Sequence, residues 1–261
     1  MYTVSNLWNE IFTGQKHHWY EYTVVIGEIG RLITKAGENI TFGGVAILVS
    51  QGGADSGFGE SQIESLSISL RSFSENVPSV GSCLSGELDL SMIRPAGEIP
   101  RMALVRPYVR ITNGEQTSEW IPQGIFYIDT RETTQNDDGL DVITIHAYDA
   151  MLMTERDYPD TTHSWPVVDT DVVSEIAAAL GVGVDERTWA VMTDAYQISA
   201  PAGYSMREIL GYIAAMYAGN WVMNYDGDLL LIPINSIPPE TNYLVDSSGF
   251  AIVFGGDRIL V

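Results

Sequence analysis

The sequence predicts a mainly β fold with an α+β part, in which an antiparallel β-barrel is followed by a small domain of two helices on a sheet. Two observations predict this order. From Tyr20 to Ala147 the chain consists of short runs that are β-branched or alternate apolar with polar residues, divided by Gly, Pro, Asn and Asp, as in sandwiches and barrels. After residue 170 the apolar residues recur instead at the spacing of helices.

The composition is that of a folded protein, and it limits the partners. Of 261 residues, 45% are hydrophobic and 18% are charged, which is typical of a globular chain with one large or two ordinary domains. The 13 basic and 34 acidic residues give a formal charge of −21. Because nucleic acids and anionic membranes are bound by clustered Lys and Arg, we expect no specific nucleic-acid binding and no attraction to membranes.

The N-terminal arm, residues 1–19, is expected to hold one short helix at residues 5–13 that ends at Gly14. Its apolar face would consist of Leu7, Trp8, Ile11 and Phe12. The chain starts without the basic residues and apolar run of a signal peptide. No stretch approaches the ~20 apolar residues of a transmembrane helix, so no stable membrane insertion is expected.

Four stretches of the following region are expected to contain strands. Residues 20–28 and 39–50 are apolar runs rich in β-branched residues, whereas residues 64–73 and 86–92 alternate apolar with polar side chains. The alternating positions are Leu66, Ile68 and Leu70 in the first of these and Leu88, Leu90 and Met92 in the second. Residues 50–61 are expected to form a flexible loop.

Residues 124–155 carry the strongest pattern, which predicts a strand, a polar turn, a second strand and an acidic start to a helix. The tip of this hairpin holds Asp137 and Asp138 before Gly139, and these residue types favour turns. Asp149 follows the second strand where a helix N-cap would stand, because its carboxylate can accept hydrogen bonds from the first free N–H groups of a helix. Asp149 is therefore predicted to cap and not to catalyse.

The polar, proline-bearing residues 154–171 predict a linker and a domain boundary near residue 155. A first helix is expected at residues 171–180, ending at Gly181. Its buried side chains would be Val172, Val173, Ile176 and Leu180. The small α+β domain is expected to span residues 156–238.

A second helix is expected to begin at Ser205. The Ser205 hydroxyl and the Glu208 carboxylate have the spacing of a capping box, in which each satisfies a backbone N–H group near the other. The helix would end at Gly219 and bury Ile209, Leu210, Ile213 and Met216. Residues 220–234 then predict a hairpin, in which Asp226 and Gly227 supply the positive φ angles of a two-residue turn.

None of the usual catalytic motifs occurs: the sequence has no GxSxG, no phosphate-binding GxxxxGK[ST] loop, no HExxH and no CxxC. The single cysteine, Cys83, stands where a strand begins and is predicted to be a buried structural thiol. His17 and His18 would point to opposite faces of an extended chain, which favours surface or interface positions over a shared metal. We expect no catalytic residue, no cofactor and no metal site, and therefore no enzyme.

Three acidic pairs leave alternatives open. They are Asp137 with Asp138, Asp226 with Asp228, and Asp157 with Asp160. The first pair precedes a turn glycine and the second flanks one. Both could bind calcium weakly, but neither continues into the ligand pattern of an EF-hand, so turns are favoured. The third pair is expected to be solvated, since no aromatic-lined carboxylate cluster indicates a glycosidase.

Five stretches, taken in order along nearly the whole chain, resemble baseplate hub or tail-tip hub proteins of phage tails and of phage-like contractile injection systems. They are YEYTVVI, VGSCLSGELDLSMI, IPRMALVRPYVRI, GIFYID…ITIHAYDAML and SMREILGYIAAMYAGNWVMNYDGDLLLIPI. Each is an ordinary fold element, and the resemblance lies in their order. The structural motif residues within them are Gly124, Phe126, Asp129, Tyr148, Asp149, Ser205, Glu208, Asp226 and Gly227.

The resemblance implies a hub domain at residues 20–155 with a barrel related to the tail-tube fold. It implies a homotrimer that adapts a six-fold tail tube to a three-fold tip and lets DNA or tube cargo pass during viral genome ejection. The implied partners are the tail tube or distal tail protein, the tape measure protein and the tip or spike protein. The implied location is the virion tail or baseplate, assembled in the cytoplasm of the host bacterium. A charge of −21 suits a conduit that does not bind DNA.

The chain departs from that family in its length. Hub subunits carry two barrel-like domains, and a second barrel needs about a hundred residues, whereas about twenty follow the predicted hairpin. Residues 239–261 are expected to be strands that return to a barrel, because a chain seldom ends on an exposed β-branched edge. We expect Phe250 to Val261 to lie against the first barrel or a neighbouring subunit, which leaves open a natural chain that continues further.

Two other functions stay open on the sequence alone. A β-rich receptor- or glycan-binding tail-tip module would expose aromatic side chains on loops, for which Trp120 and Trp165 are candidates, although both also suit core or rim positions. A cell-wall hydrolase, which related tail-tip proteins carry in downstream domains, would need a Cys/His/Asp or metal constellation. The sequence shows no such constellation.

Overall fold

The computed structural model describes most of the chain between residues 4 and 234, together with two short pieces beyond it. It leaves out residues 15, 28–29, 32–40, 43–44, 47, 50–53, 55–56, 72–78, 96–98, 100–101, 137, 160–163 and 202, and after residue 234 it describes residues 253–254 and 257–258. Half of the predicted loop at 50–61 lies outside the described residues, as do Asp137 and Asp160.

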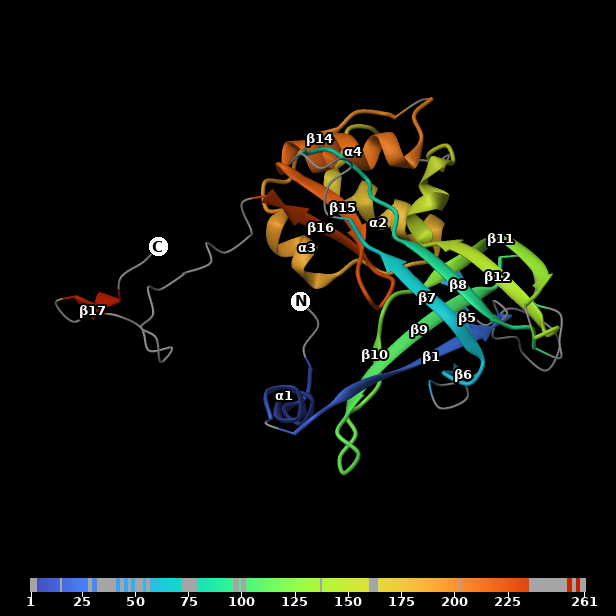
Figure 1. The fold of residues 1–261 in the computed structure, drawn as a ribbon. Helices are drawn as coiled ribbons and strands as arrows, with labels where there is room; N and C mark the ends of the chain where they lie inside the picture. Colours follow the sequence, from blue (N-terminus) through green and yellow to red (C-terminus); the bar gives the residue numbers. More distant parts are fainter. Residues whose placement is uncertain are drawn as a thin grey trace.

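A large antiparallel sheet forms the first half of the molecule (Figure 1). Its strands are β1 (Trp19–Gly27), β6 (Phe58–Gly59), β7 (Ile63–Ser69), β8 (Glu87–Ile93), β9 (Leu104–Thr112), β10 (Ile121–Pro122), β11 (Phe126–Gln135) and β12 (Asp141–Tyr148). They lie in the order β6-β1-β9-β11-β12-β8-β7, and β10 also pairs with β9. The predicted β-rich, antiparallel fold is confirmed.

The two edges of this sheet are β6 and β7, and the chain passes from one to the other through residues 60–62. A link of three residues spans at most roughly 14 Å, so the sheet curls until its edges approach each other. Among the described residues, however, β6 and β7 do not pair. The expected barrel is therefore not closed by hydrogen bonds between its edge strands.

Four further strands of two residues each pair among themselves, β2 with β5 and β3 with β4. They are β2 (Gly30–Arg31), β3 (Thr41–Phe42), β4 (Val45–Ala46) and β5 (Leu48–Val49). Near the end of the chain, β17 (Val253–Phe254) pairs with β18 (Asp257–Arg258). Neither of these last strands pairs with the large sheet among the described residues, and their predicted contact with a barrel or a neighbouring subunit stays a prediction.

Helix α1 (Asn6–Thr13) precedes the sheet and packs against β9. Its N-cap is Ser5, whose hydroxyl oxygen accepts a hydrogen bond from the Trp8 N–H at 3.1 Å. Ser5 is itself held by the Glu119 carboxylate, which accepts from the Ser5 N–H at 2.8 Å and from its hydroxyl at 2.6 Å. As predicted, the helix ends before Gly14.

The second half combines helices with a small hairpin. Its elements are the 3₁₀ helix η2 (Ala150–Glu155), α2 (Asp169–Leu180), α3 (Glu186–Val191), α4 (Met206–Met216), the hairpin of β15 (Gly219–Met223) and β16 (Leu229–Pro233), and the pair of β13 (Val167–Val168) and β14 (Gln197–Ile198). In α2 all four predicted apolar side chains are buried. Gly181 ends this helix with a left-handed φ of 73°.

Several details of this half differ from the prediction. The helix predicted after Asp149 is present, as the single 3₁₀ segment η2, whereas α3 was not expected. Met216 is 40% exposed, because α4 ends there and Gly219 already begins β15. The predicted linker contains β13.

The turn between β15 and β16 also differs from the prediction. It spans five residues, and in it Gly227 has a positive φ of 85° whereas Asp226 does not. The carboxamide oxygen of Asn224 accepts hydrogen bonds from the N–H groups of Asp226 at 2.9 Å and Asp228 at 2.8 Å. The side chain of Asn224 therefore organises the turn.

A segment from the first half of the chain extends the small hairpin on its β15 side. Residues 79–84 run parallel to β15, and the Trp221 N–H donates to the Ser82 carbonyl at 2.8 Å. The Leu84 N–H donates in turn to the Trp221 carbonyl at 2.9 Å. The hairpin is thus bonded to a segment that lies far before it in the sequence.

The other side of the hairpin, along β16, is covered as well. The Leu229 N–H donates to the Gly183 carbonyl at 2.9 Å, and the Leu229 carbonyl accepts from the Asp185 N–H at 3.0 Å. The Thr188 hydroxyl accepts the Leu231 N–H at 3.1 Å. At Pro233, the last residue of β16, the backbone has no N–H group that would need a partner.

Two hydrophobic clusters hold the molecule together. The sheet cluster consists of Val24, Leu88, Leu90, Met92, Ile99, Ala103, Val105, Phe126, Ile128, Ile143, Ile145 and Ala147. The helix cluster consists of Cys83, Ala150, Met151, Val172, Val173, Ile176, Leu180, Met192, Met206, Ile209, Leu210, Ile213, Ala214, Tyr217, Trp221, Met223, Leu229 and Leu231. Three of its members precede residue 155, and the predicted domain boundaries stay a prediction. No helix among the described residues is long and apolar enough to cross a membrane.

Candidate functional site

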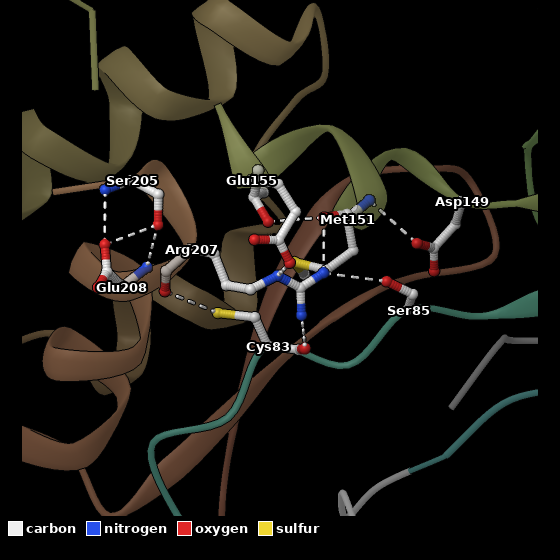
Figure 2. A network of polar contacts seen from close by, with 9 residues as sticks. Cys83, Ser85, Asp149, Met151, Glu155, Ser205, Arg207 and Glu208 are labelled. Carbon is white, nitrogen blue, oxygen red and sulfur yellow. Dashed lines mark hydrogen bonds and ion pairs between the residues drawn. The ribbon is translucent and has the colours of Figure 1, made fainter. Parts of the chain in front are cut away.

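The candidate site is a polar joint between the two halves, where the end of β12, the 3₁₀ helix η2 and the start of α4 meet residues 83–86 (Figure 2). We define the polar joint as Cys83, Ser85, Gly86, Asp149, Met151, Glu155 and Arg207. Sequence analysis singled out Asp149 and Cys83. It missed Arg207, which binds the other segments together.

Asp149 stands between β12 and η2 with 4% of its surface exposed. One carboxylate oxygen accepts the Met151 N–H at 3.0 Å, which is the predicted N-cap contact. The other accepts the Gly86 N–H at 2.6 Å, and the Asp149 N–H donates back to the Gly86 carbonyl at 3.1 Å. The same side chain therefore caps η2 and holds the residue that precedes β8.

Burial governs the charge of this carboxylate. It raises the pKa of Asp149 from 3.8 to about 6, although the two N–H donors and the Arg207 guanidinium act in the opposite direction. At neutral pH the group is therefore ionised. A Cβ at Gly86 would lie 2.9 Å from the Asp149 oxygen and 2.7 Å from a Leu70 methyl carbon, so the close approach of the two segments requires glycine.

Arg207 reaches from the first turn of α4 to two other segments, residues 83–85 and η2. One guanidinium nitrogen donates to the Cys83 carbonyl at 2.5 Å, and the other terminal nitrogen donates to the Ser85 hydroxyl at 3.2 Å and to the Met151 carbonyl at 3.1 Å. Its Nε lies 2.6 Å from a Glu155 carboxylate oxygen as an ion pair. The planar fork of donors on Arg suits this multiple contact, which Lys cannot reproduce.

Cys83 is the buried structural thiol that the sequence predicts. It is 7% exposed, belongs to the helix cluster and donates a weak hydrogen bond from Sγ to the Arg207 carbonyl at 3.5 Å. Burial raises the pKa of the Cys83 thiol to about 12, which outweighs the opposing charge of Arg207. Because the thiolate is the nucleophile, this thiol is inert at neutral pH.

The start of α4 carries the predicted capping box. The Ser205 hydroxyl accepts the Glu208 N–H at 3.2 Å, and the Glu208 carboxylate accepts the Ser205 N–H at 2.8 Å. This pair determines where α4 begins, and Arg207 lies inside that first turn (Figure 2). The capping box therefore positions Arg207 toward the polar joint.

The motif residues on the large sheet serve its packing. Gly124 has a φ of 124°, and a Cβ there would lie 2.7 Å from the Phe126 ring, which is 1% exposed in the sheet cluster. Asp129 is exposed at a β-bulge, where the pairing of β11 with β12 shifts its register. Tyr148 makes an edge contact with the His146 ring at 4.7 Å.

Asp226 and Gly227 lie at the tip of the β15–β16 hairpin, and this tip contacts the sheet half of the molecule. A Cβ at Gly227 would lie 2.8 Å from a methyl carbon of Ile125. The tip therefore rests on the residue that precedes β11. Within the motif set, a hydroxyl and a carboxylate meet at Ser205 and Glu208, 3.0 Å apart, and this contact belongs to the capping box of α4.

A cavity of about 810 Å³ lies beside the polar joint, between the β15–β16 hairpin and the end of the large sheet. Its walls include Leu70, Leu84, Val222 and Leu230 together with Asp149, Asp185 and Arg187. The last two are paired, since the Asp185 carboxylate accepts from Arg187 at 2.6 and 2.8 Å. This hydrogen bonding holds the pKa of Asp185 below its usual range, so the cavity contains no poised acid or base from this pair.

The remaining candidate residues are engaged or exposed singly. His18 contacts the rings of Phe12 at 5.7 Å and Tyr20 at 6.1 Å, whereas His17 is exposed beside it. The Arg110 guanidinium stacks over Trp120 at 4.2 Å. Within the part of the chain that the structure describes, no group of three or more His, Cys, Asp or Glu residues has the arrangement of a metal site.

The sequence predictions did not include a turn that occurs twice or a buried hydrogen bond between Tyr217 and Asp169. Residues 136–140 repeat the turn of residues 224–228: the Asn136 carboxamide oxygen accepts the N–H groups of Asp138 at 3.1 Å and Leu140 at 3.0 Å. The shared pattern Asn-x-Asp-Gly is the signal that could have shown both turns. The buried hydrogen bond from the Tyr217 hydroxyl to the Asp169 carboxylate, 2.6 Å long, leaves no such signal.

The fold and the polar joint together define a class: a β-rich protein whose antiparallel sheet is tied to a helix–hairpin half by polar contacts that are structural. No family model matches the chain, and no curated protein matches it. Solved structures that resemble it include a 43 kDa tail protein of prophage MuSo2 from Shewanella oneidensis, with 14% identity and a TM-score of 0.47. A tail protein from Neisseria meningitidis has 13% identity and a TM-score of 0.43, and the Francisella PdpA–VgrG complex has 10% and 0.44.

These matches cover 83%, 89% and 85% of this chain, but 56%, 53% and 33% of the respective solved chains. The chain thus spans about half or less of the length of each structure. Identities of 10–14% and TM-scores below 0.5 describe a loose likeness in the path of the chain. They do not assign the chain to a family.

Proposed function

We propose that this chain is a structural protein of a phage tail or baseplate. In this proposal it is a hub that forms a homotrimeric ring between a six-fold tail tube and a three-fold tip and leaves a passage for DNA or tube cargo. Its partners are the tail tube or distal tail protein, the tape measure protein and the tip or spike protein. It acts in the virion, and it is not an enzyme.

The observation that carries the proposal is the ordered resemblance of five stretches over nearly the whole chain. Four of the stretches fold into the kind of element that the resemblance implies, whereas the third, for which it implies a pair of strands, contains the single strand β9 among its described residues. In order, the five stretches contain β1, the segment that leads into β8, β9, the β11–β12 hairpin with the joint at Asp149, and α4 with the β15–β16 hairpin. The proposal rests on this order and not on the similarity in structure.

The residues of the polar joint fit a structural role. The Asp149 carboxylate, the Cys83 thiol and the Arg207 guanidinium are each held in contacts between segments. The thiol is protonated at neutral pH because burial raises its pKa to about 12. A load-transmitting subunit needs its two halves to move as one, and contacts of this kind provide that connection.

The charge of the chain supports the same proposal. With 34 acidic and 13 basic residues, its surface repels polyanions and lowers their local concentration. A conduit for DNA benefits from walls to which DNA does not adhere. In this reading the acidic surface keeps the passage free of bound nucleic acid.

The test is to tag the chain and image purified tails from cells that assemble them. We expect the label at the tail tip, and quantitative mass spectrometry should give three copies per particle. Absence from the particles, or distribution along the whole tube, would contradict the proposal. A matched assay of the purified chain on peptidoglycan should show no cleavage, and cleavage would point to the hydrolase alternative.

The two candidate residues of the glycan-binding alternative are half-buried and each contacts other side chains. Trp120 is covered on one face by Arg110, and Trp165 packs against the helix cluster and near Tyr158, with ring centres 6.1 Å apart. A sugar-stacking platform needs an aromatic face that is open to solvent. The face of Trp120 under Arg110 and the side of Trp165 that packs on the helix cluster are therefore not available as such a platform.

A further inference from the structure

One edge of the large sheet is open along its length in the part of the chain that the structure describes. This open edge is β7, whose seven residues pair with β8 on one side and with no described strand on the other. At about 3.3 Å per residue the open edge is roughly 23 Å long. Along it, alternate N–H and C=O groups point away from β8, and such groups can pair with a further strand.

The open edge carries little that would repel another strand. Its sequence, IESLSIS, contains no Lys, Arg or Pro, and its one charged residue is Glu64, beside a β-bulge between Ile63 and Ser65. The Glu64 carboxylate accepts hydrogen bonds from the Ser91 hydroxyl at 3.2 Å and from the Asn136 carboxamide at 2.9 Å. Since Ser91 lies on β8 and Asn136 at the β11–β12 turn, this charge is directed away from the open edge.

The side chains of β7 determine which strand fits beside it. Leu66 and Ile68 point to one face of the sheet, where they pack on the sheet cluster. On the other face three serines of β7 stand opposite one serine and two carboxylates of β8. These pairs are Ser65 with Ser91, Ser67 with Asp89 and Ser69 with Glu87.

These two rows favour an added strand in which apolar residues alternate with Lys or Arg. Its apolar side chains would extend the row of Leu66 and Ile68, because neighbouring strands place paired side chains on the same face. Its basic side chains would lie above the serines and reach toward Asp89, whose side chain is 63% exposed. The complementary charges would fix the orientation of the strand.

The open edge leads into the cavity of about 810 Å³. β7 ends at Ser69, and the next two residues, Leu70 and Arg71, line the cavity. Figure 1 shows β7 pointing toward the β15–β16 hairpin, which forms the opposite wall. The Leu70 side chain is 48% exposed at this point. A strand that continues past the end of β7 would therefore bring one of its residues into the cavity.

The hairpin presents an apolar wall to that residue. Trp221 and Leu229 belong to the helix cluster, whereas the neighbouring Val222 and Leu230 line the cavity. Strands that are apolar on both faces are typically covered on both, and here the helix cluster covers only one. The volume of the cavity lies within the range of mostly apolar binding sites. A large apolar side chain, such as Phe or Leu, suits it.

We propose that an extended segment of a partner protein adds to β7 as a further strand and places a large apolar side chain in the cavity. The segment alternates apolar residues with Lys or Arg. Hydrogen bonds along the open edge supply affinity, and the cavity selects the residue at the end. The inference goes beyond the proposed hub, because it does not depend on a ring of copies.

The first test measures the binding of synthetic peptides to the full chain by fluorescence polarisation. Two peptides of eight residues alternate Val with Lys and carry Phe at the first or the last position, because the strand can run in either direction. We expect saturable binding of one of them. A peptide of the same composition in scrambled order controls for attraction by the net charge of −21, and it should bind at least about tenfold more weakly.

Methylated peptides then test the hydrogen bonds without altering the protein. N-methyl groups on one alternate set of residues block the N–H groups that face β7, whereas those on the other set block only groups that face solvent. We expect one methylated peptide to bind at least about tenfold more weakly and the other to bind like the parent. Equal binding of both methylated peptides, or of the scrambled peptide and the parent, would overturn the inference.

Two variants of the chain test the cavity. Leu70→Asp places a charge at its mouth, and Leu140→Asp is the matched control, because Leu140 is 46% exposed at the β11–β12 turn. We expect peptide binding weakened at least about tenfold in the first variant and unchanged in the second. Equal binding by both variants, or no saturable binding of either peptide to the wild type, would overturn the inference. Self-association of the chain that Ser67→Lys abolishes would assign the open edge to a second copy and would overturn it as well.

Discussion

The sheet cluster and the helix cluster are both closed to water, but they are assembled in different ways. In the sheet cluster, buried side chains occupy alternate positions of single strands, as Leu88, Leu90 and Met92 do on β8. In the helix cluster they come from segments as distant as Cys83 and Leu231. A local pattern is enough to mark the first, whereas the second exists only when remote segments pair.

That difference makes the helix cluster depend on contacts other than apolar packing. Residues 79–84 reach it through backbone hydrogen bonds to Trp221, and η2 reaches it through the Asp149 cap. Arg207 then binds both segments to α4. We therefore expect substitutions in the polar joint to loosen the helix cluster and to leave the sheet cluster nearly unchanged.

The largest effect is expected for Trp221→Ala. Trp221 is 0% exposed and its indole N–H donates to the Leu210 carbonyl at 2.8 Å, so truncation leaves a cavity and removes this buried hydrogen bond. We expect a loss of about 3–5 kcal/mol in the free energy of unfolding. Urea denaturation measures it, with Leu90→Ala in the sheet cluster as the comparison, at about 2–5 kcal/mol. A loss below about 0.5–1.5 kcal/mol, the cost of a single Ile-to-Val change in a core, would contradict the central position of Trp221.

The second effect is expected for Arg207→Ala, which removes the donors of the polar joint. We expect a loss of about 1.5–3 kcal/mol, because three carbonyl or hydroxyl acceptors and Glu155 lose a charged partner. Hydrogen exchange should show faster exchange at the Leu84 N–H than in the wild type. Arg187→Ala is the matched control: this exposed pair with Asp185 should contribute only about 0.2–1 kcal/mol. Equal losses for both variants would show that the polar joint has no special role.

The third prediction concerns Asp149 and pH. Burial raises the pKa of Asp149 in the folded state from 3.8 to about 6, so between these values the folded state binds more protons than the unfolded state. The contribution of Asp149 to stability therefore falls as the pH rises from 3.8 to 6 and is constant above. Unfolding measured from pH 4 to 7 should show the wild type losing stability relative to Asp149→Asn over this window.

Asp149→Ala extends the same test. Loss of the cap should reduce stability by about 0.5–2 kcal/mol at neutral pH. Asp185 supplies a control of opposite sign, since hydrogen bonding to Arg187 lowers its pKa. Its contribution is present above its ordinary pKa and is lost as the pH falls. A wild type and an Asp149→Asn variant with parallel pH profiles would show that Asp149 keeps an ordinary pKa.

The smallest effects are expected at the two Asn turns. Asn136→Ala removes two hydrogen bonds to backbone N–H groups at an exposed tip and should cost about 0.5–1.5 kcal/mol. Asn224→Ala should cost more, because the Asn224 amide also donates to Asp185 at 2.8 Å beside the helix cluster. Thermal unfolding of the two variants side by side measures the difference. A larger loss of stability for Asn136→Ala than for Asn224→Ala would contradict this prediction.

The sequence predicted those elements whose signal is local. Alternation placed β7 and β8, helical spacing placed α2 and α4, and the Ser205 and Glu208 spacing placed the capping box. Asp149 was predicted as a cap, but its second contact with Gly86 joins segments 63 residues apart. No local pattern encodes that contact, nor the reach of Arg207 to Cys83 across 124 residues.

The differences have the same cause. Leu70 alternates with Leu66 and Ile68 in the sequence, yet it is 48% exposed because β7 ends at Ser69. The helix predicted after Asp149 is present, and its 3₁₀ geometry is a detail that the sequence pattern did not specify. The domain boundary near residue 155 rests on composition and stays a prediction; residues 79–84, which precede it, bond to β15, which follows it.

The pairing of residues 79–84 with β15 has a consequence for the newly made chain. Ser82 and Asn220, which bond to each other, are separated by 138 residues. At a synthesis rate of about 5–20 residues per second, Ser82 leaves the ribosome roughly 10–30 seconds before its partner exists. During that interval the sheet half can form most of its strand pairs, but residues 79–84 have neither β15 nor α4 to bind. The helix half is therefore completed last, when residues 79–84, which were synthesised in the first third of the chain, pair with β15.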